Sequence, residues 1–201
     1  MLIIAFVEQD VVWDGIIRPF SEDDMALKST IYKAELQVAD LDRGHFADYS
    51  LTIARHPSET DERMMVRLLA FALHAGEDLR FGKGLSAEEE AAVWEVDPAG
   101  VIRLWIDVGL PDEGRIKKAC PRTDKMVVIL YGARAADIWW KQNASALERY
   151  KNLEIWQLTA EDSAKLVALA GRNMKLACTI QEGLVYLDGA EVRPVLLRGT
   201  L

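Results

Sequence analysis

Polar and apolar residues alternate along two early segments of the chain. Residues 27–38 read LKSTIYKAELQV, and residues 46–54 read FADYSLTIA. A period of two is typical of strands with one buried face, and both segments contain many β-branched and aromatic residues. The polar connection between the segments contains Gly44, a residue suited to a turn. The pattern therefore predicts a β-hairpin.

A helical period replaces this alternation in residues 59–75. The apolar residues that recur at helical spacing, and so form the expected core stripe, are Met65, Leu68, Leu69 and Ala72. Ser58 precedes the segment and suits the N-cap of a helix. Glu62 lies on the flank of the stripe, whereas Arg63 and Arg67 fall toward its outer side. We expect an amphipathic helix with one face on the core.

Strands and helices alternate in the middle of the chain, and strands return at its end. Strands are expected over residues 92–96, 101–108, 125–131, 153–158, 175–181, 184–187 and 191–197. Helices are expected from residue 112 onward as a short cationic segment, and over residues 135–150 and 159–170. Residues 76–85 are expected to form a loop and residues 86–90 a short acidic segment. This order indicates an α/β or α+β domain, with a mixed central sheet flanked by helices and antiparallel hairpins.

One charged residue interrupts the most apolar of these strands. Residues 101–108 read VIRLWIDV, with Asp107 close to the end of the strand. An ionised carboxylate in a buried strand costs several kcal/mol unless a metal ion, a cation or hydrogen bonds compensate it. We therefore expect a partner for Asp107. The alternative is that Asp107 faces solvent at the strand end, and the pattern leaves both possibilities open.

The composition fits a single domain with a sizeable core, because half of the 201 residues are hydrophobic. The formal net charge of −8 argues against general adhesion to nucleic acid or to an anionic membrane. Residues 1–24 hold six acids and one base, so they carry −5 of this charge and the remainder carries −3. A remainder this close to neutral is compatible with a local basic groove. We expect residues 1–24 to be an extension outside a domain formed by residues 25–201.

The sequence also indicates where in the cell the protein is located. No stretch reaches the roughly 18 to 20 consecutive apolar residues of a membrane span, and the N-terminus lacks the cationic start and cleavage site of a secretory signal. Cys120 and Cys178 fall in different predicted elements without zinc-binding spacing, and we expect both to be reduced core residues. These features predict a cytoplasmic protein without membrane association.

Three acids are gathered by the predicted order of helix, strand and strand. Glu62 lies on the helix flank, and antiparallel pairing brings Glu90, at the start of one strand, toward Asp107 at the end of the next. Carboxylates that converge at one end of a sheet are suitable ligands for Mg²⁺. The alternative for Glu62 is a favourable charge at a helix N-terminus. The motifs of nucleotide-binding loops, zinc proteases and serine hydrolases are absent from the sequence.

Five longer motifs carry a resemblance to a known family. They read MALKSTIYKAELQVADLDR from Met25, ARHPSETDERMMVRLLAFAL from Ala54, WIDVGLPDEGRIKKA from Trp105, ARAADIWWKQN from Ala133 and NLEIWQL from Asn152. On these motifs, residues 25–197 resemble the bacterial YaeQ family, and residues 1–24 lie outside the resemblance. The resemblance implies a compact variation on the PD-(D/E)XK nuclease core.

The resemblance also implies a site. In that superfamily two acids on neighbouring strands bind the metal ion, a helix glutamate often completes the site, and a lysine two residues after the second acid orients the attacking water. When the site positions of the superfamily are transferred to this sequence through the motifs, the strand acids are Glu90 and Asp107 and the helix acid is Glu62. The resemblance implies Mg²⁺ or Mn²⁺ as the cofactor. The lysine position holds Gly109 instead. We expect Lys117 to reach back in its place, with a solvated surface cation as the alternative.

Three functions follow as hypotheses. The first is a metal-dependent phosphodiesterase that acts on DNA or RNA. The second is a nuclease-derived module that holds nucleic acid or a protein partner without cutting it, and the third is a purely structural or partner-binding protein. If nucleic acid is bound, the expected phosphate contacts are Arg63, Arg67, Arg115 and Lys118.

The extension yields the first testable prediction. A chain that starts at Met25 should fold with the same midpoint of thermal unfolding as the full chain, because residues 1–24 share neither the charge balance nor the motifs of the domain. The two midpoints are compared by circular dichroism. A shortened chain that fails to fold, or that melts well below the full chain, would show that the extension is structural.

Overall fold

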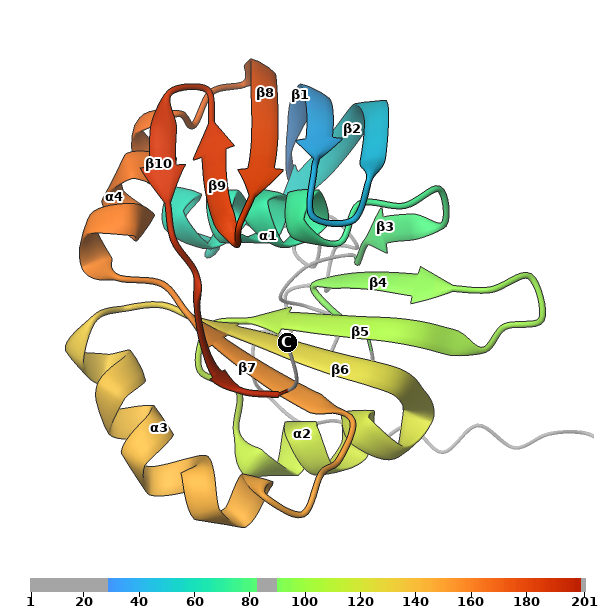
Figure 1. Ribbon diagram of the computed structural model, residues 1–201, viewed down its shortest axis with the longest axis vertical. Coiled ribbons are helices and arrows are strands. Elements are labelled where there is room, and N and C mark those ends of the chain that lie inside the picture. Colours follow the sequence, from blue (N-terminus) through green and yellow to red (C-terminus); the bar gives the residue numbers. More distant parts are fainter. Residues whose placement is uncertain (1–28, 83–89, 200–201) are drawn as a thin grey trace, which may run out of the picture.

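The computed structural model describes residues 29–82 and 90–199, and these residues form two mixed β-sheets and four α-helices (Figure 1). The five-stranded sheet has the order β10-β9-β8-β1-β2 and consists of β1 (Thr30–Asp40), β2 (His45–Arg55), β8 (Asn173–Gln181), β9 (Leu184–Leu187) and β10 (Ala190–Val192). The six-stranded sheet has the order β11-β7-β6-β5-β4-β3 and consists of β3 (Leu79–Phe81), β4 (Val93–Val96), β5 (Ile102–Val108), β6 (Thr123–Leu130), β7 (Leu153–Gln157) and β11 (Val195–Arg198). The helices are α1 (Asp61–Leu73), α2 (Glu113–Ala119), α3 (Arg134–Leu147) and α4 (Ala160–Ala168), and the short 3₁₀ turn η2 (Cys120–Arg122) follows α2.

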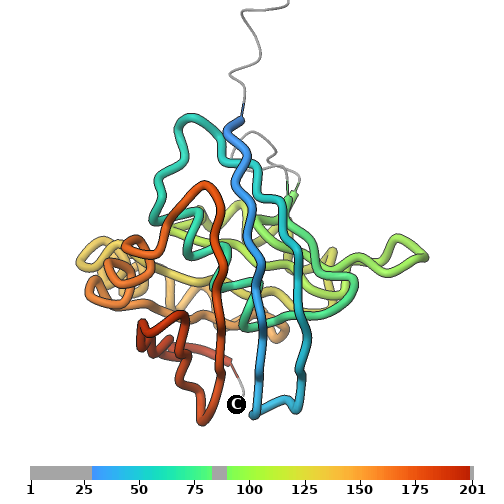
Figure 2. Tube along the Cα trace, turned by 90° about the horizontal axis from the view of Figure 1, so that it is seen from above, coloured from blue at the N-terminus to red at the C-terminus, as the bar shows by residue number. Residues whose placement is uncertain are grey.

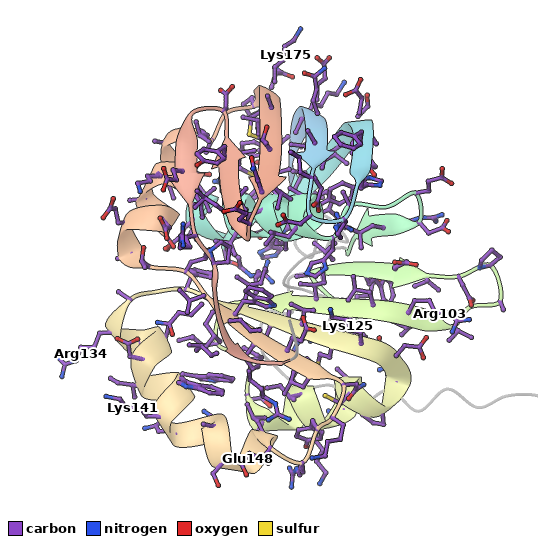
Figure 3. All side chains as sticks on the ribbon, in the orientation of Figure 1. Arg103, Lys125, Arg134, Lys141, Glu148 and Lys175 are labelled. Atoms are coloured by element: carbon purple, nitrogen blue, oxygen red, sulfur yellow. The ribbon has the colours of Figure 1, made fainter. Side chains whose placement is uncertain are left out.

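The five-stranded sheet is built on the predicted hairpin. β1 and β2 pair antiparallel from Thr30 opposite Arg55 to Asp40 opposite His45, and the turn contains Gly44 in the left-handed region at φ +65°. Alternate residues of β1 are buried and exposed, as the period of two requires. β8 then joins β1 in parallel. Lys175 of β8 points away from the molecule, on the solvent side of this sheet (Figure 3).

The six-stranded sheet has a parallel centre and antiparallel edges. β5, β6 and β7 run parallel, whereas β3, β4 and β11 pair antiparallel. Helices α2 and α3, which connect the parallel strands, cover the same face of the sheet (Figure 1). The turn between β4 and β5 extends away from the body in both views (Figure 2). Asp97 closes this turn, because its Oδ1 accepts hydrogen bonds from the backbone N–H groups of Ala99 and Val101, both at 2.9 Å.

Helix α1 lies between the two sheets (Figure 1), and its central part is buried on all sides, whereas its first three residues and its last residue are partly exposed. Its nine consecutive residues from Met64 to Ala72 are all buried, and they pack into one apolar cluster with side chains from both sheets. The predicted core stripe is confirmed, but it is only part of the buried surface. A helix between two sheets has no solvent face, so polar side chains on it need partners inside the protein.

Arg67 shows this consequence most directly. We expected it on the outer side of the helix, but its side chain is 0% exposed, so that expectation is wrong. Its Nη2 lies 2.8 Å from Oε2 of Glu59 and also donates to the carbonyl oxygen of Ala54 at 3.2 Å. Arg63 binds the other oxygen of Glu59 at 2.7 Å. Burial lowers the pKa of Arg67, and the negative charge of Glu59 opposes that change.

Several local predictions are confirmed and others need correction. The α+β class is confirmed, although the strands divide between two sheets and do not form one central sheet. The predicted loop contains the short strand β3. The predicted strand 191–197 divides into β10 and β11, which belong to different sheets. The N-cap of α1 is Thr60, whose hydroxyl accepts from the N–H of Arg63 at 3.1 Å, and not Ser58.

Two further expectations can be compared with the described residues. Those for residues 1–24 and for most of the acidic segment 86–90 cannot, because these residues lie outside the described ranges. Across the described ranges, no helix combines the length and apolar character needed to cross a membrane. Cys120 and Cys178 are both buried free thiols, as expected, and burial raises the pKa of each to about 11.

The buried ion pair yields the second prediction. Glu59→Gln should lower the free energy of unfolding by about 3–5 kcal/mol, because it leaves the guanidinium of Arg67 buried without a countercharge. Denaturant unfolding followed by fluorescence measures this change. The matched control is Glu161→Gln, which removes one charge from the exposed Glu161–Lys165 pair of α4 and should barely change stability. Equal effects of the two substitutions would contradict the structural role of the buried pair.

Candidate functional site

Asp107 has the partner that its burial demands, and this partner is Arg115. The carboxylate is only 3% exposed and faces the same side of the six-stranded sheet as Trp105, beneath α2. Arg115 binds both of its oxygens, with Nε 2.6 Å from Oδ2 and Nη2 2.7 Å from Oδ1. The same Nη2 lies 2.8 Å from the carbonyl oxygen of Glu90. A fork-shaped guanidinium suits such a bidentate pair, which is stronger than a single neutral hydrogen bond.

The local sequence explains how Arg115 reaches this position. Gly109 ends β5 in the left-handed region at φ +102°, and its N–H donates to the carbonyl oxygen of Ile129 at 2.9 Å. Asp112 caps α2 by accepting from the N–H of Arg115 at 2.8 Å. Ile116, which follows Arg115, is fully buried and anchors the helix on the sheet. The turn, the cap and the anchor together direct Arg115 back onto the end of β5.

The structure does not bring Glu62 to Asp107. Glu62 lies in the first turn of α1, which packs against the face of the six-stranded sheet that carries Ile106 and Val108. Asp107 lies on the opposite face, toward α2. Glu62 instead lines a shallow hollow between α1 and α4. Among residues 29–82 and 90–199, no three His, Cys, Asp or Glu side chains are grouped so that they could hold a metal ion.

The two lysines of α2 differ in their surroundings. Lys118 lines a cavity of about 210 Å³ beside the helix, together with Arg115, Arg122 and Trp105. Lys117, which we expected to reach the site, is exposed and does not line this cavity. The structure therefore gathers three cationic side chains, from Arg115, Lys118 and Arg122, around one hollow. We refer to these three residues as the cationic cluster.

Trp105 forms the aromatic wall of this cavity. The guanidinium carbons of Arg115 and Arg122 each lie 5.6 Å from the centre of its ring, which is within cation–π range. Trp94 of β4 contacts the same ring edge-on, with the ring centres 6.0 Å apart. The indole is only 2% exposed. These contacts restrict the movement of the two arginines.

Arg122 was not among the predicted site residues, although the sequence carries a signal for it. Residues 115, 118 and 122 follow the helical spacing of three and four that places side chains on one face. α2 ends at Ala119, but η2 continues the helical course through Cys120 to Arg122, with Pro121 near its start. The spacing thus extends beyond the helix that the sequence predicted.

The arginines of α1 belong to a different environment. Arg67 has no exposed surface with which to contact a phosphate, and Arg63 is bound to the carboxylate of Glu59. Tyr131 lies near this network, and burial raises its pKa to about 12. Of the four expected phosphate contacts, only Arg115 and Lys118 line the cavity next to α2.

Comparison with known proteins identifies close relatives. The family model described as YaeQ protein matches residues 25–195. The YaeQ protein of Escherichia coli strain K12 is 53% identical over 164 residues, which cover 82% of this chain and 91% of that protein. The YaeQ protein of Salmonella typhi is 51% identical over 166 residues, which cover 83% of this chain and 92% of that protein.

Two crystal structures share the fold. The YaeQ protein from Xanthomonas axonopodis pv. citri superposes with a TM-score of 0.83 at 46% identity, over 86% of this chain and 100% of that chain. The YaeQ protein from Pseudomonas syringae superposes with a TM-score of 0.81 at 39% identity, over 86% of this chain and 97% of that chain. Both similarities extend over most of the chain.

The pair of Asp107 and Arg115 yields the third prediction. Arg115→Met should lower the free energy of unfolding by about 3 kcal/mol, because it keeps much of the side-chain volume but leaves a buried carboxylate uncompensated. Chemical denaturation measures the change. The matched control is Arg103→Met, which disrupts the exposed contacts of Arg103 with Asp97 and Asp124 and should have little effect. If both variants are equally stable, the pair does not support the fold.

Proposed function

Because the chain belongs to the YaeQ family, and because an arginine neutralises its buried strand carboxylate, we propose that it is a nucleic-acid-binding module on a nuclease-like core of the PD-(D/E)XK kind. In this proposal it holds the phosphate backbone without hydrolysing it. The observation that carries the proposal is the bidentate contact of Arg115 with both oxygens of Asp107, at 2.6 and 2.7 Å. That contact occupies the carboxylate on which a metal site would depend.

The chemistry of the pair favours binding over hydrolysis. A divalent ion would supply a bound water of lowered pKa and would polarise the phosphoryl oxygen. A guanidinium carries a single delocalised charge and has no open coordination position, so it cannot supply that water. Gly109 stands where the superfamily has its catalytic lysine, and Lys117 lies outside the cavity. Phosphate recognition needs only hydrogen-bond donors and positive charge, and Lys118, which lines the cavity, provides both.

The overall charge limits how the module binds. A chain with a net charge of −8 has no general attraction for nucleic acid, so affinity has to come from the local cationic cluster. Two or three neutralised phosphates correspond to a slope of roughly −2 when the logarithm of the binding constant is plotted against the logarithm of the salt concentration. Binding should therefore be modest and lost readily as salt is added.

A metal-dependent phosphodiesterase is the second candidate, and one observation favours it. The carboxylate of Asp107 and the carbonyl oxygen of Glu90 both converge on one cationic group, as oxygen ligands around a metal ion do. In this reading Arg115 would have to leave Asp107, and Glu90, Asp107 and Glu62 would have to hold Mg²⁺ or Mn²⁺. The described arrangement does not fit that ligand set, since Glu62 extends from α1 on the opposite face of the sheet.

The fourth prediction separates the two candidates. Labelled single-stranded DNA and RNA should bind the wild type without divalent ions, as measured by fluorescence anisotropy over a range of salt concentrations. Arg122→Ala should weaken binding by about tenfold, because it removes one charged phosphate contact. The matched control is Lys141→Ala, which removes one exposed charge from α3, where Lys141 points away from the body (Figure 3).

The same samples, incubated with Mg²⁺ or Mn²⁺, are examined for cleavage by gel electrophoresis. We expect intact strands. Cleavage that requires the divalent ion and disappears in Asp107→Asn would replace the binding module with the phosphodiesterase. If neither DNA nor RNA binds at low salt, both candidates are wrong and the partner-binding hypothesis takes their place.

A further inference from the structure

The outer face of the five-stranded sheet is open to solvent. Helix α1 lies against the inner face, no helix among the described residues covers the outer face, and Lys175 projects outward from it (Figures 1 and 3). Two aromatic side chains belong to this outer face, Phe46 of β2 and Tyr186 of β9, and they are 68% and 42% exposed. Monomeric proteins commonly expose single apolar residues, whereas two aromatic rings on one uncovered sheet face are typical of an interaction surface.

The register of the strands arranges the outward side chains in four rows that cross the sheet. The first row, nearest the start of β1, consists of Thr52, Lys33 and Asn173. The second row consists of Ser50, Glu35 and Lys175. The third row consists of Asp48, Gln37 and Ala177, with Asp188 beside Ala177. The fourth row consists of Phe46, Ala39, Thr179, Tyr186 and Glu191.

Charges of opposite sign occupy the two halves of this face. The first two rows hold two lysines and one glutamate, whereas the last two rows hold three acids, from Asp48, Asp188 and Glu191. Lys175 lies 3.5 Å from Glu35, but both side chains are largely exposed, so this pair is weak and free to exchange partners. A face with one positive and one negative half is complementary to a second copy of itself that is turned by 180°. The three acids make the same face a poor match for nucleic acid.

The shape of the face favours the same partner. Two hollows of about 500 and 460 Å³ share Gln37, Asp48 and Ala177, so they form one depression along the third row. The longer side chains of Glu35 and Lys175 stand in the neighbouring second row. A two-fold axis that passes between these rows, perpendicular to the strands, lays the second row of each copy over the third row of the other. Long side chains of one copy then meet the depression of the other.

We infer that two copies of the chain associate through this outer face into a symmetric dimer. In this dimer Lys175 approaches the partner's Asp188, and the symmetry repeats the contact. The first row of each copy lies over the fourth row of the other, so that Lys33 meets the ring of the partner's Phe46 in a cation–π contact. The inference is independent of nucleic-acid binding, because the face lies at the opposite end of the molecule from α2 (Figure 1).

The size of the contact predicts a weak dimer. The three strands that carry all four rows, β2, β1 and β8, are about 4.8 Å apart, and the four rows span about 27 Å. These spacings correspond to roughly 400 Å² of each copy in projection, at the low end of specific interfaces. We therefore expect a dissociation constant of roughly 10–100 µM.

Sedimentation velocity of the full chain, without nucleic acid and at low salt, tests the inference. Between about 1 and about 300 µM the wild type should change from monomer to dimer. Lys175→Glu should raise the dissociation constant at least tenfold, because it sets two acids opposite each other at two symmetric positions. Phe46→Ser should weaken the dimer by about tenfold through the lost ring contact.

The matched control is Lys141→Glu, which changes the net charge as Lys175→Glu does but lies on α3 and points away from the body (Figure 3). It should leave the dissociation constant unchanged, and thermal unfolding confirms that all variants fold. A wild type that stays monomeric up to about 300 µM would overturn the inference and leave this face to another partner. A dimer that both Lys175→Glu and Phe46→Ser retain would form through a different surface. Equal weakening by Lys141→Glu would trace the effect to net charge, and the inference would again be wrong.

Discussion

The position of α1 between two sheets is the constraint on which the rest of the molecule depends. A helical segment with no solvent face must be apolar or internally paired, and the nine residues from Met64 to Ala72 meet this condition. Eight of them are apolar, and the ninth, Arg67, is matched by Glu59. Both sheets pack their inner faces on this helix, so its ion pair lies within the shared core.

The same rule operates at Asp107 with a different consequence. A carboxylate at the end of a buried strand must be neutralised, and Arg115 does so from a helix that begins only a few residues later. At Arg67 the pair serves the core alone. At Asp107 the pair lies at the surface of a cavity and fixes one of three cations there. Two ion pairs of similar chemistry thus differ in their surroundings, because only one of them borders a cavity.

Local patterns in the sequence predicted most of the elements but not their arrangement. The hairpin of β1 and β2, the helices and the parallel strands follow from period and capping, which depend on near neighbours. The division into two sheets depends on β8 pairing with β1, a contact between distant segments that no local period reveals. Arg67 was assigned to the outside because an amphipathic pattern assumes one solvent face. The sequence left open whether Asp107 is paired or faces solvent, and the partner we expected was a divalent cation. The partner in the structure is Arg115, whose position depends on the turn at Gly109 and the cap at Asp112.

The pairing of distant segments also sets the order in which the protein can fold during synthesis. Lys33 of β1 lies beside Asn173 of β8, and Val195 of β11 completes the edge next to Gln157 of β7. Neither sheet is therefore complete until nearly the whole chain has left the ribosome. Until then β1 has an open edge, which is a site for pairing with other chains. Folding that depends on such non-local contacts is slow. Protection of the nascent chain from aggregation therefore matters more here than in a helical bundle of equal length.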